Sequence, residues 1–198
     1  MLKLYAAVVA VLVPSALGVF GDAQPDATFR PVAVLAPALA SAPASVSADS
    51  LDDATIVAIF DAANTADIET ASLAAQRGRS KEVRQLGAQF AHDHRAVRQQ
   101  GHDLAKRLGV TPTPPKNDKS AVEHARVMRL LRSKHGTAFD RAWAQHEVAY
   151  HQAVIDAVTH TLLPSIHNPE LKAFVEKVAP AFQAHLLAAQ QLAAKVAN

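Results

Sequence analysis

Two long stretches of this 198-residue sequence repeat apolar residues at steps of three and four, and each repeat contains a histidine. Such spacing is typical of the face that an α-helix packs against a core. His94 belongs to the repeat over residues 83–108, and His185 belongs to the repeat over residues 171–196. An imidazole in a core needs partners, because an unpaired buried polar group costs roughly 1–3 kcal/mol. The two positions therefore indicate a helical protein whose interior accommodates something polar.

The composition favours helices and excludes several classes of site. Aromatic residues make up only 5% of the chain and alanine is abundant, which suits close packing of helices more than a sheet. The sequence has no cysteine, so disulfides and thiolate metal sites are excluded. The formal net charge is only +2, and we therefore expect no electrostatic binding of nucleic acid.

The N-terminus has the order of regions found in a secretory signal peptide. Lys3 precedes an apolar run over residues 4–13, and small residues follow at Ala16 and Gly18. The run is shorter than the roughly 20 apolar residues that a transmembrane helix needs. We therefore expect export, to the periplasm or in association with the outer membrane, and no transmembrane helix in the mature protein.

A second segment of the same type follows the first. Arg30 precedes the apolar run over residues 31–40, and small residues recur near Ala48. Either segment is a candidate for cleavage, and a single signal followed by an Ala/Pro/Ser-rich linker is the other interpretation. Under both interpretations, residues 1–50 are signal peptide or linker and residues 51–198 form the folded domain.

Capping signals divide the domain into four long helices and one short helix. We expect the long helices over about 53–76, 80–108, 137–162 and from 168 to the C-terminus, and the short one over about 120–134. A capping box of Ser120 and Glu123 is expected to open the short helix, and Gly136 to follow its end. The simplest all-α arrangement is a ferritin-like four-helix bundle with the short helix in the crossover between the second and third long helices.

One polar residue lies near the middle of each long helix, on the face predicted to be buried: Glu69, His94, His151 and His185. Residues at mid-helix meet at one level of an antiparallel bundle, which is how ferritin-like proteins build metal sites. This donor set suits one zinc, copper(II) or iron(II) ion. Asp93 and Glu147 are predicted to support the ligands rather than to bind the metal.

A hydrogen-bonded polar core without a metal is the competing interpretation, because a lone core histidine is more often held by a backbone carbonyl or a carboxylate. The Glu-x-x-His pairs of di-iron bundles are missing, since Ala91 and Phe182 stand three residues before His94 and His185. Six other histidines are predicted to lie on the solvated surface, at positions 92, 102, 124, 135, 160 and 167. No nucleophile elbow, phosphate loop or catalytic triad is present.

Several short motifs resemble, in the same order, those of the exported bacterial family DUF4142, often labelled "predicted outer membrane protein". They are Ile68-Glu69, Phe90-Ala91-His92-Asp93-His94, Gly136-Thr137-Ala138-Phe139-Asp140, Tyr150-His151 and Ala179-Pro180 through His185. The resemblance covers about residues 53–196. It implies a ferritin-like bundle in the periplasm or cell envelope, without an established activity.

The residues that resemble the polar set of this family are Glu69, Asp93, His94, His151 and His185. Two positions depart from the family pattern. Tyr150 stands where the family usually has an acidic residue, and Glu147 stands where it often has an apolar one.

Three functions remain open at this point. The first is a protein that binds one transition-metal ion, with zinc, copper or iron as the candidate cofactor. The second is a metal-dependent oxidase or peroxide-consuming enzyme. The third is a metal-free structural or interaction module, in which polar core residues only define how the helices pair. Association with the envelope and formation of a homo-oligomer are compatible with each.

Overall fold

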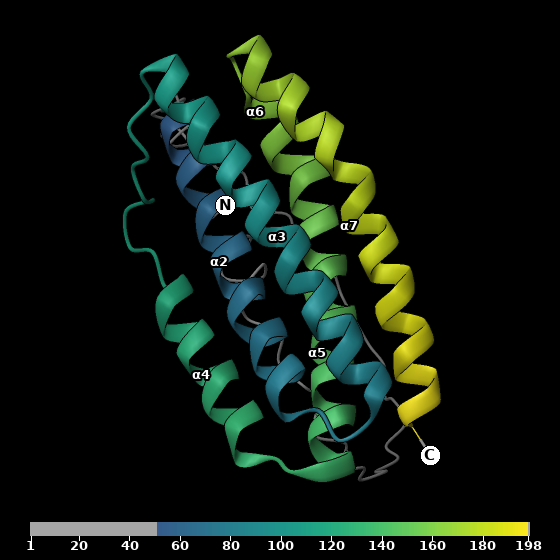
Figure 1. Ribbon diagram of the computed structural model, residues 1–198. Helices are drawn as coiled ribbons and strands as arrows, with labels where there is room; N and C mark the ends of the chain where they lie inside the picture. Colours follow the sequence, from purple (N-terminus) through teal and green to yellow (C-terminus); the bar gives the residue numbers. More distant parts are fainter. Residues whose placement is uncertain (1–50, 198) are drawn as a thin grey trace, which may run out of the picture.

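The computed structural model describes residues 51–197, and all regular elements in that range are helices, without a strand (Figure 1). The elements are α2 (Asp53–Arg77), α3 (Lys81–Leu108), α4 (Ser120–Ser133), α5 (Gly136–Ala157), the π-helix η1 (Val158–Leu162), α6 (Leu163–Ser165) and α7 (Pro169–Val196). The predicted signal segments and linker, residues 1–50, lie outside the described residues. Among the described helices, none combines the length and the apolar character needed to cross a membrane.

Local capping explains where three of the long helices begin. The side chain of Asp52 accepts a hydrogen bond from the Thr55 backbone N–H, and that of Ser80 accepts one from the Val83 N–H. Asn168 accepts from two N–H groups at the start of α7. Gly109 ends α3 in the left-handed conformation, with φ of 68°. The predicted bounds of these helices are confirmed to within a residue or two.

The start of α4 differs from the prediction. Ser120 is the first residue of the helix, and its backbone N–H and hydroxyl both donate to the carboxylate of Asp118. Glu123 pairs with Arg126 instead of closing a capping box. The expected capping box is therefore wrong, because an acceptor two residues upstream satisfies the first free N–H group. Gly136 is the first residue of α5 rather than a spacer before it.

The third long helix does not continue as a regular α-helix to residue 162. It changes to the π-helix η1, in which the N–H of Leu163 donates to the carbonyl of Val158. Pro164 follows directly and has no N–H to extend a regular ladder. Such π turns occur most often at functional sites, so the neighbourhood of η1 is of interest for the site described below.

The four long helices form two antiparallel pairs, α2 with α3 and α5 with α7, which pack together through α3 with α7 and α2 with α5 (Figure 1). The long connection that contains α4 returns along the outside of the bundle, so that α3 and α5 run in the same direction. The α2 and α3 backbones approach closely at Gly87, where an added Cβ would lie 2.7 Å from the carbonyl oxygen of Ala71.

Two apolar clusters fill the interior, one toward each end of the bundle. The first includes Ile56, Phe60, Leu104, Val175 and Phe182, and the second includes Val83, Phe90, Phe139, Trp143 and Leu192. On each long helix, buried polar residues occupy the positions between the two clusters: Asn64, Asp67 and Thr70 on α2, His94 on α3, His146, Glu147 and His151 on α5, and His185 on α7. The core is therefore divided by a polar layer at mid-height.

Candidate metal centre

Three of the predicted ligands meet in this polar layer. His94, His151 and His185 come from α3, α5 and α7, and they are 5%, 1% and 6% exposed. One ring nitrogen from each lies within 4.8 Å of one from each of the others. The interpretation of His94 and His185 as inward-facing residues of two amphipathic helices agrees with this position.

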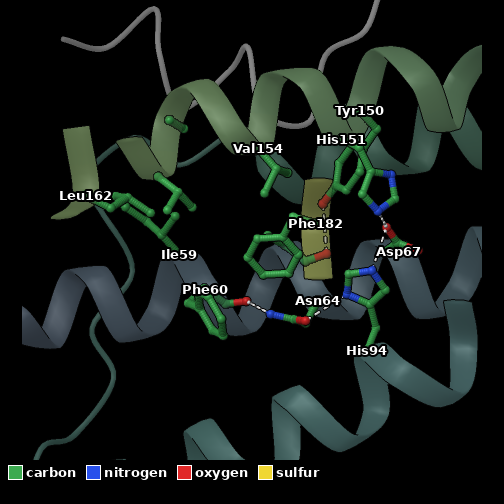
Figure 2. A pocket seen from close by; sticks show the side chains of 13 residues that line it. Ile59, Phe60, Asn64, Asp67, His94, Tyr150, His151, Val154, Leu162 and Phe182 are labelled. Atoms are coloured by element: carbon green, nitrogen blue, oxygen red, sulfur yellow. Dashed lines mark hydrogen bonds and ion pairs between the residues drawn. The ribbon is translucent and has the colours of Figure 1, made fainter. Parts of the chain in front are cut away.

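Glu69 does not join these histidines. Its side chain is 51% exposed and contacts His124 on α4, with Oε2 2.7 Å from Nε2 of that ring. The carboxylate that the structure brings to the histidines is Asp67, whose side chain is fully buried. Its Oδ2 lies 3.3 Å from Nε2 of His94 and 3.4 Å from Nε2 of His151 (Figure 2).

Glu69 is expected on the buried face of α2, but the rotation of the helix about its axis places Asp67 there instead. Every residue from Ile56 to Phe60 is buried, so the first half of the helix is apolar on nearly all sides and does not reveal which face meets the core. The second half carries the signal that could have identified Asp67. Phe60, Asn64, Asp67, Ala71 and Ala74 are spaced by steps of four and three, and all of them are buried.

Hydrogen bonds at the outer ring nitrogens orient two of the imidazoles. Asn64 donates from its amide to the carbonyl of Phe60, so that its Oδ1 faces Nδ1 of His94 at 2.9 Å. Nδ1 of His151 donates to the backbone carbonyl of Glu147 at 3.0 Å. In a neutral imidazole only one nitrogen carries hydrogen. Nε2 of His94 and Nε2 of His151 therefore direct lone pairs toward Asp67.

His185 is oriented in the same way by an acidic residue on α3. Its Nε2 lies 3.1 Å from Oδ2 of Asp93, whose side chain is 37% exposed. This carboxylate accepts the hydrogen from Nε2, which leaves a lone pair on Nδ1. That nitrogen faces Nε2 of His94 at 3.2 Å. Asp93 thus touches a histidine of the cluster from the solvent side, and its supporting role remains a prediction.

The inward-facing atoms of the cluster are all hydrogen-bond acceptors when the rings are neutral and the Asp67 carboxyl is ionised. Both carboxylate oxygens of Asp67 and Nε2 of His151 are buried and make no hydrogen bond with the described residues. Such atoms are costly to bury unless a hydrogen or a cation lies between them. The arrangement is suited to binding a positively charged species.

Glu147 adds a second buried carboxylate next to the first. The Thr70 hydroxyl lies 3.1 Å from Oε1, whereas Oε2 has no hydrogen-bond partner in the part of the chain that the structure describes. One ligand atom from each of Asp67, Glu147 and His151 lies within 4.8 Å of the others. The sequence placed Glu147 on the apolar face of its helix, and the structure shows it to be fully buried there.

Burial shifts the protonation of these groups toward their uncharged forms. It lowers the pKa of His94 to about 3 and that of His151 to about 4. Burial also raises the pKa of the Asp67 carboxyl, and burial together with the neighbouring Asp67 raises the pKa of Glu147 well above 4.5. His94 and His151 are therefore neutral at physiological pH, which is the form that binds metals.

Aromatic rings separate the cluster from solvent. Phe90 stacks on His185 with ring centroids 4.1 Å apart, and the Phe182 ring lies nearly parallel to that of His94 at 6.0 Å. Such packing lowers the local dielectric and strengthens electrostatic interactions inside.

Outside the cluster, two histidines that the sequence assigned to the solvated surface pair with carboxylates, His102 with Asp61 and His124 with Glu69. His146 on α5 is also buried. Burial and the neighbouring His124 lower its pKa to about 4.

One protein family matches the chain. It is described as a domain of unknown function (DUF4142), and the match covers residues 37–192, which include all the cluster residues. No curated protein and no solved structure matches the chain.

Proposed function

Because this chain belongs to the DUF4142 family, described as a domain of unknown function, we propose its function from the buried cluster: the protein binds one transition-metal ion. The ligands are His94, His151 and His185 together with Asp67 in place of the Glu69 expected from the sequence. Asn64, Asp93 and the Glu147 carbonyl hold the rings.

The observation that carries the proposal is the spacing of the inward-facing donor atoms. A tetrahedral zinc ion with bonds of about 2.0–2.1 Å has ligand atoms about 3.3–3.4 Å apart. Three distances between neighbouring donor atoms are 3.2 Å for His94 to His185, 3.3 Å for His94 to Asp67 and 3.4 Å for His151 to Asp67. The three histidines form one group of donor atoms within 4.8 Å, and Asp67 forms a second group with Glu147 and His151. Each ring also has an acceptor on its far nitrogen, the arrangement that orients histidine ligands in metalloproteins.

The chemistry of the donors narrows the choice of metal. Imidazole and carboxylate ligands without a thiolate suit zinc, copper(II) or iron(II) and give no preference for copper(I). Magnesium and calcium favour sites made of oxygen ligands alone. The cofactor we propose is therefore a zinc, copper or iron ion.

The test compares metal binding by wild type and His185→Leu in protein purified without an affinity tag. We expect zinc, copper(II) or iron(II) to bind wild type with one ion per chain in calorimetry and to raise its melting temperature, because a ligand of the folded state stabilises it by mass action. His185→Leu removes a ligand while restoring an apolar residue, so the metal-dependent shift should be lost.

A core that is only structural gives the opposite pattern. Wild type then shows no metal-dependent melting with any of the three ions against a chelator control. The leucine variant is more stable than wild type at every metal concentration, because an apolar residue replaces a buried polar one. This result would reject the metal site and favour the structural module.

We also propose that the bundle is ferritin-like in topology and that the protein acts in the cell envelope. The parallel course of α3 and α5 across a long connection supports the first point. The signal-like segments before residue 50 support the second. Cell fractionation with N-terminal sequencing of the mature protein tests export, and intact protein in the cytoplasm would contradict it.

A further inference from the structure

A small cavity of about 20 Å³ lies beside the proposed ligands, lined by residues of α2, α3, α5, η1 and α7 (Figure 2). Asp67, His94 and His151 line one end. Leu162, Ile59 and Phe60 lie on the opposite side, with Val154 and Phe182 between (Figure 2). Val158 also belongs to the apolar lining. A cavity needs roughly 10–15 Å³ to hold one water molecule, so this cavity is larger than a single water requires.

Two of the polar side chains that line the cavity, Asn64 and Tyr150, are committed to other partners. The amide of Asn64 bonds to Phe60 and His94, and the Tyr150 hydroxyl donates to the carbonyl of Ala63 at 2.8 Å. The inward atoms of Asp67, His94 and His151 are the ones assigned above to the metal. The apolar end therefore presents no side-chain group that would hold a water molecule, which needs two to four polar partners.

The apolar end is formed where α5 changes its helical period. Val158 and Leu162 are the first and last residues of η1, and both line the cavity. A π-helix is rare and occurs frequently at functional sites. The π-helix and the cavity thus occur at the same place in the fold, and His151 lies on α5, which directly precedes η1.

We propose that this cavity binds a small, uncharged, non-polar molecule of the size of dioxygen, next to the metal ligands. Apolar cavities stay dry, and one of about 150 Å³ binds benzene or xenon, so an apolar space of about 20 Å³ is suited to a smaller non-polar molecule. Hydrogen peroxide fits poorly, because its hydroxyl groups would face apolar walls without partners. The cavity therefore distinguishes between the two substrates that an oxidase or a peroxide-consuming enzyme would use.

Xenon is the probe for the test, since it is non-polar and close in size to small gas molecules. Metal-free protein with ¹³C-labelled methyl groups is titrated with xenon under pressure and followed by NMR. We expect saturable shifts at the methyl groups of Ile59, Val154 and Leu162. The methyl groups of Val83, Leu131 and Leu192 belong to the other apolar cluster and should not shift.

Two substitutions on α5 provide a matched pair. Val154→Phe fills the cavity and should abolish the xenon-dependent shifts. Val148→Phe adds the same bulk six residues earlier, where the side chain packs against the other cluster, and should leave the shifts unchanged. If Val154→Phe does not fold, Val154→Leu adds a single methylene and should weaken xenon binding.

The proposal is overturned if the lining methyl groups of wild type do not respond to xenon. It is also overturned if filling the cavity leaves the response unchanged. Because the experiment uses metal-free protein, its result is independent of the calorimetry proposed above. A chain that binds xenon but no metal would reject the metal site alone, and the reverse result would reject the cavity alone.

Discussion

Two of the acidic residues on helix α2, Asp67 and Glu69, are two positions apart and lie in opposite environments. The Asp67 side chain is fully buried among histidines from α3 and α5, and neither of its oxygens makes a hydrogen bond within residues 51–197. The Glu69 side chain is half exposed and pairs with His124 of α4. Exposed ion pairs contribute about 0–1 kcal/mol, whereas burial of a carboxylate costs several kcal/mol unless it is compensated.

Glu69 thus stabilises a surface contact, whereas burial of Asp67 costs free energy. The cost of burying the Asp67 carboxylate is compensated when a positively charged species binds next to it. The surface pair needs no such partner, because water solvates both charges. Substitutions at the two positions should therefore differ most in experiments that add or withhold a metal.

The largest expected effect concerns metal affinity. Asp67→Ala should lower the affinity for the bound ion by more than about 100-fold, since loss of a merely supporting residue already costs about 10–100-fold. Glu69→Ala should change the affinity by less than about two-fold, because the exposed pair is remote from the ligands. Calorimetric titration of both variants measures the difference. Equal losses in the two would contradict the assignment of Asp67.

A second effect is the pH dependence of stability in the metal-free protein. The unfolded chain binds a proton on His94 near pH 6.5, whereas burial lowers the pKa of the folded state to about 3. The contribution of His94 to stability is thus complete above pH 6.5 and is lost as the pH falls. His94→Leu should gain stability relative to wild type by up to about 1.4 kcal/mol per pH unit below 6.5. Urea unfolding at pH 7, 6 and 5 measures this gain.

Glu147→Gln should show the opposite sign. Burial raises the pKa of this carboxyl, so the folded protein keeps a proton that the unfolded chain releases above about pH 4.5. Relative to wild type, the glutamine variant should become more stable as the pH rises from that value. Glu69→Gln serves as the surface control, and a flat difference for both carboxyls would show that Glu147 is ionised in the folded state.

An intermediate effect is expected at Asp93, which contacts the cluster from the solvent side. Asp93→Asn weakens the acceptor for Nε2 of His185 and should lower metal affinity by about 10–100-fold. Asp103→Asn is a matched control on α3, because Asp103 is exposed and, among the described residues, accepts a hydrogen bond only from Gln99 in the same helix. An unchanged metal affinity in Asp93→Asn would show that Asp93 does not support metal binding by the four ligands.

The smallest effect is expected for the surface pair itself. Glu69→Gln removes the charge that faces His124 and should change the free energy of unfolding by less than about 1 kcal/mol. Thermal unfolding with and without metal measures it. A larger loss would mean that α4 depends on this contact to stay on the bundle, and that the two carboxylates differ less than their burial indicates.

The ends of the helices could be predicted from the sequence because capping is local. Asp52 and Ser80 each bond to the N–H three residues ahead, so the cap residue and its partner are read together from one short segment. Inward positions of His94 and His185 could also be predicted, since α3 and α7 each carry one apolar stripe. A narrow stripe defines the rotation of a helix about its axis.

The tertiary structure corrected which carboxylate meets those histidines. Near its start α2 is buried on all sides, so the local pattern left its rotation open, and the packing of Gly87 against Ala71 and Ala75 brings Asp67 inward. The cavity beside η1 likewise depends on side chains from several helices. Caps are determined by neighbours in the chain, whereas a site shared by four helices depends on relative rotations that no single segment encodes.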